Sequence, residues 1–438
     1  MKGHTVSIGY KKAAGAAIGV CLLAVVGCSS SGGSGTGSSS TAATSTSAAN
    51  PAPPGTSTSA VNTPTGTPIK IGLAVAITGS NVLQTAPVPG VAKAWASMVN
   101  DAGGIGGHPV QIIVTDTKGD PASYQAGLKK MVESDKVVAI ITHDDVAEAS
   151  GGDYLQKNNI PVIGGTGTDL TTWAARPNYF QLQTSIPATL LAQASVAKAV
   201  DATKFGTIVC AEVSACLQAQ ALFKPAAEKL GLSWTGIVTA AATAPNYTAQ
   251  CLSLQQKKTD FISLAVVANV AQRLVPDCLQ QGFTGTFGIN AQAFVQAAAE
   301  KMSGAKIAGN LEAFPWWVDA APVQTFRDAM KKYQPSVDYR SGDATVIWST
   351  LELFRKAVGT PTGDLTPATV LADYYKVKNE TLDGLLAQPM TFTAGKAQPK
   401  VNCFWAYSYK PGDQDPKILA PAKSGNGASG DLATTCAA

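Results

Sequence analysis

The chain has 438 residues, of which 45 % are hydrophobic and only 14 % are charged, and its formal net charge is +4. A typical soluble domain has about 25 % charged residues, so this surface is unusually neutral, and the positive excess is too diluted for a nucleic-acid-binding face. No apolar run reaches the ~20 residues of a membrane-spanning helix. These values exclude polytopic membrane proteins, collagen-like repeats and small disulfide knots.

Residues 1–27 have the pattern of an export signal. Lys11 and Lys12 end a positively charged segment, and residues 13–26 are apolar and rich in small side chains. Small residues then precede Cys28. This arrangement resembles the bacterial lipobox, which implies that the thiol of Cys28 is diacylated and becomes the new N-terminus. An ordinary secretory signal with an incidental cysteine is the alternative.

The segment after Cys28 has the composition of a tether. Residues 29–67 contain only Ser, Gly, Thr, Ala, Pro, Asn and Val. Such a stretch cannot bury enough apolar surface to offset its ordering entropy, so we expect residues 28–67 to be disordered. A flexible coil of this length spans roughly 35 Å. The sequence therefore predicts a folded body held at the outer face of a bacterial cell membrane by a lipid on Cys28.

Six cysteines remain in the body, and an even number outside the cytoplasm indicates disulfides, although six cysteines permit many connectivities. Spacing favours neighbouring partners. Cys251 and Cys278 lie at similar heights on successive expected helices. The favoured pairs are Cys210 with Cys216, Cys251 with Cys278, and Cys403 with Cys436. No CxxC or CxxH spacing occurs, so no metal site is expected.

From residue 68 onward, strand patterns alternate with helical patterns in two successive runs. The first run has expected strands at 69–77, 110–115, 137–142 and 161–164, with helices at 91–102, from 120 and at 148–157. The second has strands at 205–210, 234–239, 261–267 and 286–289, with helices at 189–200, 217–230, 247–258 and 270–281. Helices at 322–333, 343–358 and 366–378 and an aromatic strand at 401–410 follow. These runs predict an α/β fold with two doubly wound parallel sheets.

Several segments together carry a family pattern. They are the strand 69–72 leading to Thr78-Gly79, the block 98–107, the strand end 114–116 followed by Asp120-Pro121, the segment 135–141, and residues 160–163 followed by 168–170. In this order and spacing, residues 68–414 resemble the branched-chain amino-acid-binding type of periplasmic substrate-binding protein, the receptor of an ABC importer.

This resemblance implies a type I periplasmic binding protein whose two lobes exchange chain three times. Lobe one is expected to comprise residues 68–188 and 315–390, and lobe two residues 189–314 and 391–420, with a C-terminal tail at 421–438. Ligands of open parallel sheets bind beyond the carboxyl ends of the strands. The polar residues expected there are Ser80, Asp144, Asp145, Thr166, Thr168, Glu212, Ser214, Asn269 and Asn290.

The sequence departs from the family pattern at the positions that would bind an α-amino acid. Val146 stands where relatives supply a serine for the ligand carboxylate, and the tyrosine expected within 211–216 is missing. The acidic group that would neutralise an α-ammonium aligns near Asn290. An unpaired ion in a closed cleft costs several kcal/mol. The resemblance therefore predicts the scaffold and leaves the ligand open.

Two groups of residues allow both a ligand role and a structural one. Asp144 and Asp145, beside His143, could meet a cationic or polyhydroxylated ligand; alternatively, the first carboxylate caps the following helix, which we favour for at least one of them. Trp316 and Trp317 could stack on a ligand, but packing is the more common role of such aromatics.

The functional prediction is a receptor that captures a small polar solute, such as an amino acid or amide, between two lobes. It would deliver the solute to an ABC permease, acting as a monomer without cofactor, metal or nucleic acid. A tethered sensor or surface-interaction protein with the same fold is the alternative. Catalysis is not expected, because no nucleophile elbow, P-loop or HExxH occurs and only His108 and His143 remain as histidine bases.

Overall fold

The computed structural model describes residues 63–79, 82–167, 173, 175–212, 214–419 and 424–437. The expected export signal, Cys28 and the tether up to residue 62 lie outside the described residues, as do Ser80 and Thr168. None of the helices in the described part of the chain has the length and apolar content needed to cross a bilayer. Those residues also contain no group of His, Cys, Asp or Glu that could hold a metal ion.

The first sheet is built from the N-terminal run of strands. Four parallel strands lie in the order β2-β1-β3-β4. Almost every residue of β1 and all of β3 are buried, which explains their continuous apolar sequences, since a parallel sheet is covered on both faces. The bounds are β1 (Ile69–Val75), β2 (Val110–Asp116), β3 (Ala139–His143) and β4 (Val162–Gly165).

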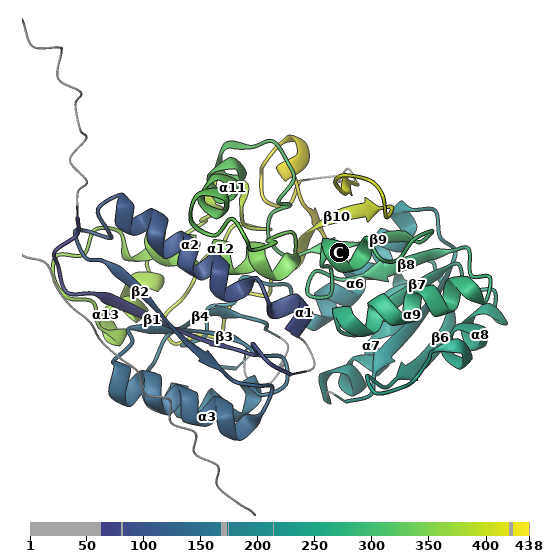
Figure 1. Cartoon of the computed structure of the whole chain (residues 1–438), viewed down its shortest axis with the longest axis horizontal. Helices are drawn as coiled ribbons and strands as arrows, with labels where there is room; N and C mark the ends of the chain where they lie inside the picture. Colours follow the sequence, from purple (N-terminus) through teal and green to yellow (C-terminus); the bar gives the residue numbers. More distant parts are fainter. Residues whose placement is uncertain are drawn as a thin grey trace, which may run out of the picture. The chain divides into compact units, whose positions relative to one another are not determined.

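Helices cover both faces of this sheet (Figure 1). On one face, α2 (Val88–Asp101) packs against α11 (Ala321–Tyr333) and α12 (Gly342–Val358). On the other, α3 (Pro121–Lys129) buries Tyr124 and Leu128 in a separate cluster. The helices that follow the second sheet's parallel strands in sequence therefore complete the first lobe.

The predicted start of α3 is confirmed. Asp120 is the N-cap, its side chain accepts a hydrogen bond from the backbone N of Ser123 at 2.7 Å, and Pro121 occupies the first turn. The helix continues as a π-helical segment, η1 (Lys130–Asp135).

The expected helix at 148–157 is interrupted. It begins as the 3₁₀ turn η2 (Glu148–Gly151) and becomes α-helical only in α4 (Gly152–Lys157). A Cβ at Gly151 would collide with Leu128 and Tyr124, so the close approach of α3 requires this glycine.

The second sheet has eight strands, in the order β11-β10-β9-β8-β7-β5-β6, with β12 paired to β10. Strands β5 to β9 are parallel, and β10 runs antiparallel to β9, β11 and β12. The bounds are β5 (Lys204–Cys210), β6 (Ser233–Ala240), β7 (Phe261–Ala265), β8 (Thr286–Ile289), β9 (Lys306–Leu311), β10 (Cys403–Tyr409), β11 (Lys417–Ile418) and β12 (Thr435–Cys436).

Two pairs of helices cover the second sheet. α6 (Ile186–Ala199) and α7 (Ser214–Lys229) contribute to one hydrophobic cluster, and α8 (Thr248–Gln255) and α9 (Ala268–Gln280) contribute to another. The shorter elements are α1 (Val82–Thr85), α10 (Gln296–Ala299), α13 (Pro367–Tyr374), η3 (Leu382–Gly384) and η4 (Gly430–Leu432).

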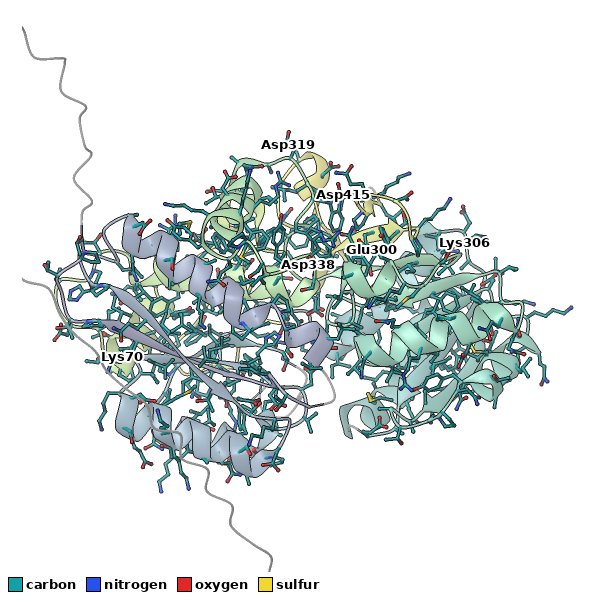
Figure 2. All side chains as sticks on the ribbon, viewed as in Figure 1. Lys70, Glu300, Lys306, Asp319, Asp338 and Asp415 are labelled. Atoms are coloured by element: carbon teal, nitrogen blue, oxygen red, sulfur yellow. A yellow bond between two sulfur atoms is a disulfide. The ribbon has the colours of Figure 1, made fainter. Side chains whose placement is uncertain are left out.

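The chain passes between the two sheets three times in the described residues: after β4, after β9 and before β10. A surface ion-pair group also joins segments of both. Arg340, just before α12, pairs with Glu300 at 2.9 Å and with Asp338 at 2.8 Å; Glu300 follows α10, and Figure 2 labels both acids. All three side chains are partly exposed, so each pair contributes little to stability.

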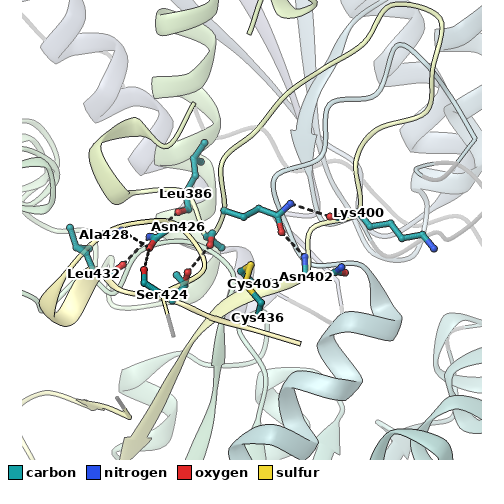
Figure 3. The surroundings of a disulfide bond; sticks show 12 residues. Leu386, Lys400, Asn402, Cys403, Ser424, Asn426, Ala428, Leu432 and Cys436 are labelled. Carbon is teal, nitrogen blue, oxygen red and sulfur yellow. Dashed lines mark hydrogen bonds between the residues drawn. A yellow bond between two sulfur atoms is a disulfide. The ribbon is translucent and has the colours of Figure 1, made fainter. Parts of the chain in front are cut away.

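The structure contains the three disulfides that the spacing favours: Cys210–Cys216, Cys251–Cys278 and Cys403–Cys436. The last one joins the C-terminal segment to β10 (Figure 3). Nearby, the Asn426 amide donates to the carbonyl oxygens of Leu386 and Leu432, at 3.3 and 2.9 Å. The described end of the chain is therefore part of the folded body.

Replacing both Cys210 and Cys216 by serine is expected to lower the free energy of unfolding by about 2 kcal/mol, because this disulfide closes a short loop. The two cysteines are six residues apart. Urea unfolding of the oxidised protein and the double variant measures the difference. No change on substitution would show that the disulfide is not formed in the purified protein.

Candidate ligand-binding site

A cavity of about 140 Å³ lies where strands of both sheets end. Its lining includes the residues that directly follow β4, β8 and β9, a residue of the loop after β3, and Cys210 and Ala265, the last residues of β5 and β7. The polar lining residues are Gln84, Asp145, Thr166, Thr184, Thr189, Asn290, Gln292 and Glu312. The remaining lining is almost wholly apolar and includes Ile186, Leu190, Ala219, Phe223 and Val266.

Asp145 enters the cavity from the loop after β3. Its Oδ2 accepts a hydrogen bond from Gln84 Nε2 at 3.1 Å, whereas Oδ1 is buried and finds no partner in the described part of the chain. Gln84 also accepts from the backbone N of Ala268 at 3.4 Å, so it links this loop to the start of α9. Burial raises the pKa of Asp145 to about 7, and the negative charges of Asp343 and Glu148 add to the effect.

Glu312 enters from the connection after β9. Thr184 Oγ1 and Thr189 Oγ1 lie 2.6 and 3.2 Å from its Oε1 as hydrogen-bond donors, whereas Oε2 is buried without a partner. The residue is only 4 % exposed. Burial raises the pKa of Glu312 to about 7; the hydroxyl groups lower it, and the charges of Asp343 and Asp145 raise it further.

A buried ion pair includes Asp343, whose charge acts on both carboxyl groups. His143 Nε2, at the end of β3, is 3.0 Å from Asp343 Oδ2, in the first turn of α12, and both side chains are almost completely inaccessible. Burial lowers the pKa of His143, but Asp343, Asp145 and Glu148 more than offset this, so its pKa is raised. The site thus combines several carboxyl groups with one imidazole.

Asp144 does not line the cavity. It is fully buried, and its Oδ1 accepts from the backbone N of Val146 at 2.9 Å and of Ala147 at 3.0 Å. Thr117 Oγ1 donates to the other carboxylate oxygen. Asp144 therefore caps the following turn, which is the structural alternative given above, and Asp145 is the member of the pair that reaches the cavity.

Thr166 and Asn290 also line the cavity, but their side chains are engaged within the protein. Thr166 Oγ1 donates to Glu148 Oε2 at 3.0 Å, and Asn290 Oδ1 accepts from the backbone N of Ala293 at 3.1 Å.

The other expected ligand residues are not among the described lining. Glu212 is exposed and accepts from the backbone N of Ala242 at 2.6 Å, so it ties together the loops after β5 and β6. Asn269 lies in the first turn of α9, and its Oδ1 is buried without a partner. Ser214 begins α7, but its side chain is not described.

The tryptophan pair is packed within the protein. Trp316 is 2 % exposed, stacks on Phe294 at a centroid distance of 5.6 Å, and donates from Nε1 to Gln296 Oε1 at 3.3 Å. Trp317 packs against Trp316 in an edge-to-face arrangement, with ring centroids 4.9 Å apart. Neither residue lines the cavity.

Sequence reasoning missed Gln84, Glu312 and the apolar part of the site. Glu312 follows β9, a strand that the sequence did not predict because Gly309 and Asn310 resemble turn residues. A Cβ at Gly309 would collide with the carbonyl oxygen of Ile289, so close strand packing requires glycine there. Ala219 and Phe223 are four residues apart on α7 and cannot be distinguished from core residues by pattern.

A family model described as periplasmic binding protein matches residues 68–414. The chain belongs to the periplasmic binding protein family. Its fold is that of the solute-binding proteins associated with ABC transporters, which confirms the predicted α/β fold class. Membership implies an extracytoplasmic location. A comparison with curated protein sequences found no match.

Solved structures of this family resemble the chain at low identity. A fatty acid ABC transporter substrate-binding protein from Thermomonospora curvata has a TM-score of 0.67 and 17 % identity, covering 80 % of this chain and 91 % of its own. A branched-chain amino acid transporter substrate-binding protein from Streptococcus pneumoniae, in complex with isoleucine, has a TM-score of 0.66 and 16 % identity. The match covers 80 % of this chain and 99 % of the other. A solute-binding protein from R. palustris, in complex with 4-hydroxybenzoate, has a TM-score of 0.68 and 14 % identity. The match covers 85 % of this chain and 98 % of the other.

Proposed function

We propose that the protein is an extracytoplasmic receptor that captures a small solute in the cavity and delivers it to an ABC importer. The observation that carries this proposal is the cavity itself, which is bounded by strand ends of both sheets and contains buried, unpartnered carboxyl oxygens. Such groups are costly unless something pairs with them. Capture requires no chemistry, because the solute is released unchanged.

The lining supports a solute with a larger apolar part than the small polar solute expected from sequence. An apolar cavity of roughly 150 Å³ holds one benzene ring, and this cavity measures about 140 Å³. The structurally similar proteins are named for a fatty acid or bound to isoleucine or 4-hydroxybenzoate, all of which are partly apolar. We therefore favour a compact amphipathic molecule.

A thermal-shift screen of the soluble body tests solute capture. The panel contains matched sets of amines, alcohols, amides, carboxylates and amino acids with small apolar groups. A true ligand at a hundredfold excess over its Kd stabilises the folded state by about 2.7 kcal/mol by mass action. Stabilisation by one chemical class, lost when the cavity is filled, supports the proposal; equal small shifts with all classes contradict it.

The lipid anchor is part of the proposal and rests on the sequence around Cys28. In bacteria grown with an alkyne-labelled fatty acid, the full-length chain is expected to become labelled and to sediment with membranes. Cys28→Ala is expected to lose the label and to be released or retained as an uncleaved precursor. Label that persists in this variant would contradict lipidation at Cys28.

Delivery to a permease separates a transport receptor from a tethered sensor. Deleting the gene is expected to abolish uptake of the solute that the purified protein binds, and re-expression should restore it. Unchanged uptake, together with confirmed binding, would favour sensing.

A further inference from the structure

We infer that the captured solute carries a protonated amine joined to a compact apolar group, with the ammonium bound between Asp145 and Glu312. This inference rests on the proposed function and names the class of solute that the same cavity takes. The family resemblance does not predict either carboxyl group as a partner of an ammonium group. It places that acidic residue near position 290, where this chain has Asn290.

Most side-chain donor groups of the described cavity lining already donate to an acceptor within the protein. The hydroxyl groups of Thr184 and Thr189 donate hydrogen bonds to Glu312, and the hydroxyl group of Thr166 donates one to Glu148. The amide nitrogens of Gln84 and Gln292 donate to Asp145 and to the carbonyl oxygen of Thr166. Of the described polar side chains in the lining, only Asn290 has an amide nitrogen that donates to no acceptor among the described residues. The lining is therefore poorly equipped to bind a carboxylate.

The two carboxyl groups that are left with a free oxygen act as acceptors once they are ionised. Asp145 Oδ1 and Glu312 Oε2 are both buried and have no hydrogen-bond partner among the described residues, and both residues line the cavity. Within the described residues, no lysine or arginine side chain lines it. A ligand that satisfies two carboxyl oxygens must bring N–H or O–H donors, and a positive charge adds a charge-assisted contribution. An ammonium group supplies both.

The rest of the lining fits the other end of such a molecule. Phe223, Leu190, Ile186 and Val266 provide an apolar surface, and the cavity volume of about 140 Å³ matches one ring. A second charge at that end would be buried without a partner, at a cost of several kcal/mol. The lining therefore disfavours a zwitterionic amino acid and favours a simple amine.

The protonation of the two acids gives the inference a pH signature. Burial raises the pKa of both Asp145 and Glu312 to about 7. Asp343, Glu148 and Asp144 raise the pKa of Asp145 and His143 lowers it, whereas Asp343 and Asp145 are the charged groups that raise the pKa of Glu312. A bound cation favours the ionised carboxylates, so binding should release protons. Affinity for an amine is expected to rise about tenfold from pH 6 to pH 8 for each carboxyl group that must ionise.

Isothermal titration calorimetry with benzylamine, benzyl alcohol and benzoate tests the inference, because the three share a ring and differ in the polar group. The soluble body is titrated at pH 6 and pH 8 in two buffers of different ionisation enthalpy. Benzylamine is expected to bind most tightly, more tightly at pH 8, and with proton release. Glu312→Gln and Asp145→Asn should each weaken benzylamine binding at least tenfold, whereas Glu228→Gln, at an exposed carboxylate of α7 outside the cavity lining, should not.

Three results would overturn the inference: preferential binding of benzoate, tighter benzylamine binding at pH 6 than at pH 8, or no benzylamine binding at all. Circular dichroism and melting curves of each variant show whether a lost affinity reflects misfolding. A neutral or anionic molecule found in the purified protein would overturn the inference that the solute is an amine. It would leave the proposal of solute capture unchanged. Absence of any retained or bound solute would count against solute capture itself.

Discussion

Glu312→Gln is expected to raise the free energy of unfolding at pH 8 by roughly 3 kcal/mol, because the native protein holds this carboxyl group in an unfavourable environment. Burial raises its pKa from the ordinary value of 4.5 to about 7. Between these values the native state retains a proton that the unfolded chain has lost, so stability falls as pH rises through this window. The loss is complete above pH 7 and absent below pH 4.5, and glutamine removes it.

Chemical denaturation at pH 4 and pH 8 measures this effect. The variant and the wild type should have equal stability at pH 4 and differ at pH 8. Glu228→Gln is the matched control, since Glu228 is exposed and only pairs with Lys224 at 3.7 Å on the surface of α7; it should change stability by less than about 1 kcal/mol at either pH. A Glu312→Gln variant that is less stable at pH 8 would show that the carboxylate has a partner in the free protein.

Asp343→Ala is expected to destabilise the protein by about 3–5 kcal/mol, because it leaves His143 buried without its counter-charge. The raised pKa of His143 means that the pair contributes fully below pH 6.5 and is lost as pH rises through the folded value. Removing Asp343 also relieves the repulsion that it exerts on Asp145 and Glu312 once they ionise. The destabilisation should therefore be larger at pH 6 than at pH 8.

Two further variants define what the ion pair contributes. His143→Leu combined with Asp343→Leu removes both charges and should recover much of the lost stability, because a buried pair can be replaced by apolar side chains. Asp338→Ala, which breaks a partly exposed ion pair with Arg340, should cost less than about 1 kcal/mol. Equal small losses for Asp343→Ala and Asp338→Ala would mean that the buried pair is not charged.

The inferred amine would offset the unfavourable free energy of burying the ionised carboxylates of Asp145 and Glu312. A cavity that must hold an ammonium group keeps carboxyl groups where the empty protein would be more stable without them. Glu312→Gln should therefore gain stability and lose amine affinity in the same variant. Pairing these two readouts on one protein distinguishes a binding role from a purely structural one.

The sequence predicted the alternation of strands and helices well, because each depends on local periodicity. The strand from Thr286 to Ile289 and the cap at Asp120 appear as expected. β9 was missed, since the close approach of Ile289 requires Gly309 and the buried Asn310 Oδ1 accepts a hydrogen bond from Gln193, and no local pattern conveys either contact. The glycine at position 151 likewise reflects a tertiary contact, the close approach of α3.

The site was only partly predictable. Asp145, Thr166 and Asn290 follow strand ends and line the cavity, because the carboxyl edge of a parallel sheet follows from topology; that they bind a ligand stays a prediction. Glu312 depends on an unpredicted strand, and Phe223 lies on a helix whose apolar residues look like ordinary core. Which acid of the pair at 144–145 faces the cavity depends on backbone N–H groups that only the folded loop brings to Asp144.

Mass spectrometry of small molecules released from the purified soluble body tests most directly whether the cavity holds a solute. The comparison is with Ala219→Phe, which fills the cavity from α7, and with Ala149→Phe, a substitution at an exposed position. Wild type and Ala149→Phe are expected to release the same amine-bearing molecule, and folded Ala219→Phe none. Equal amounts released by all three proteins, or no molecule retained by wild type at any stage of purification, would contradict the account.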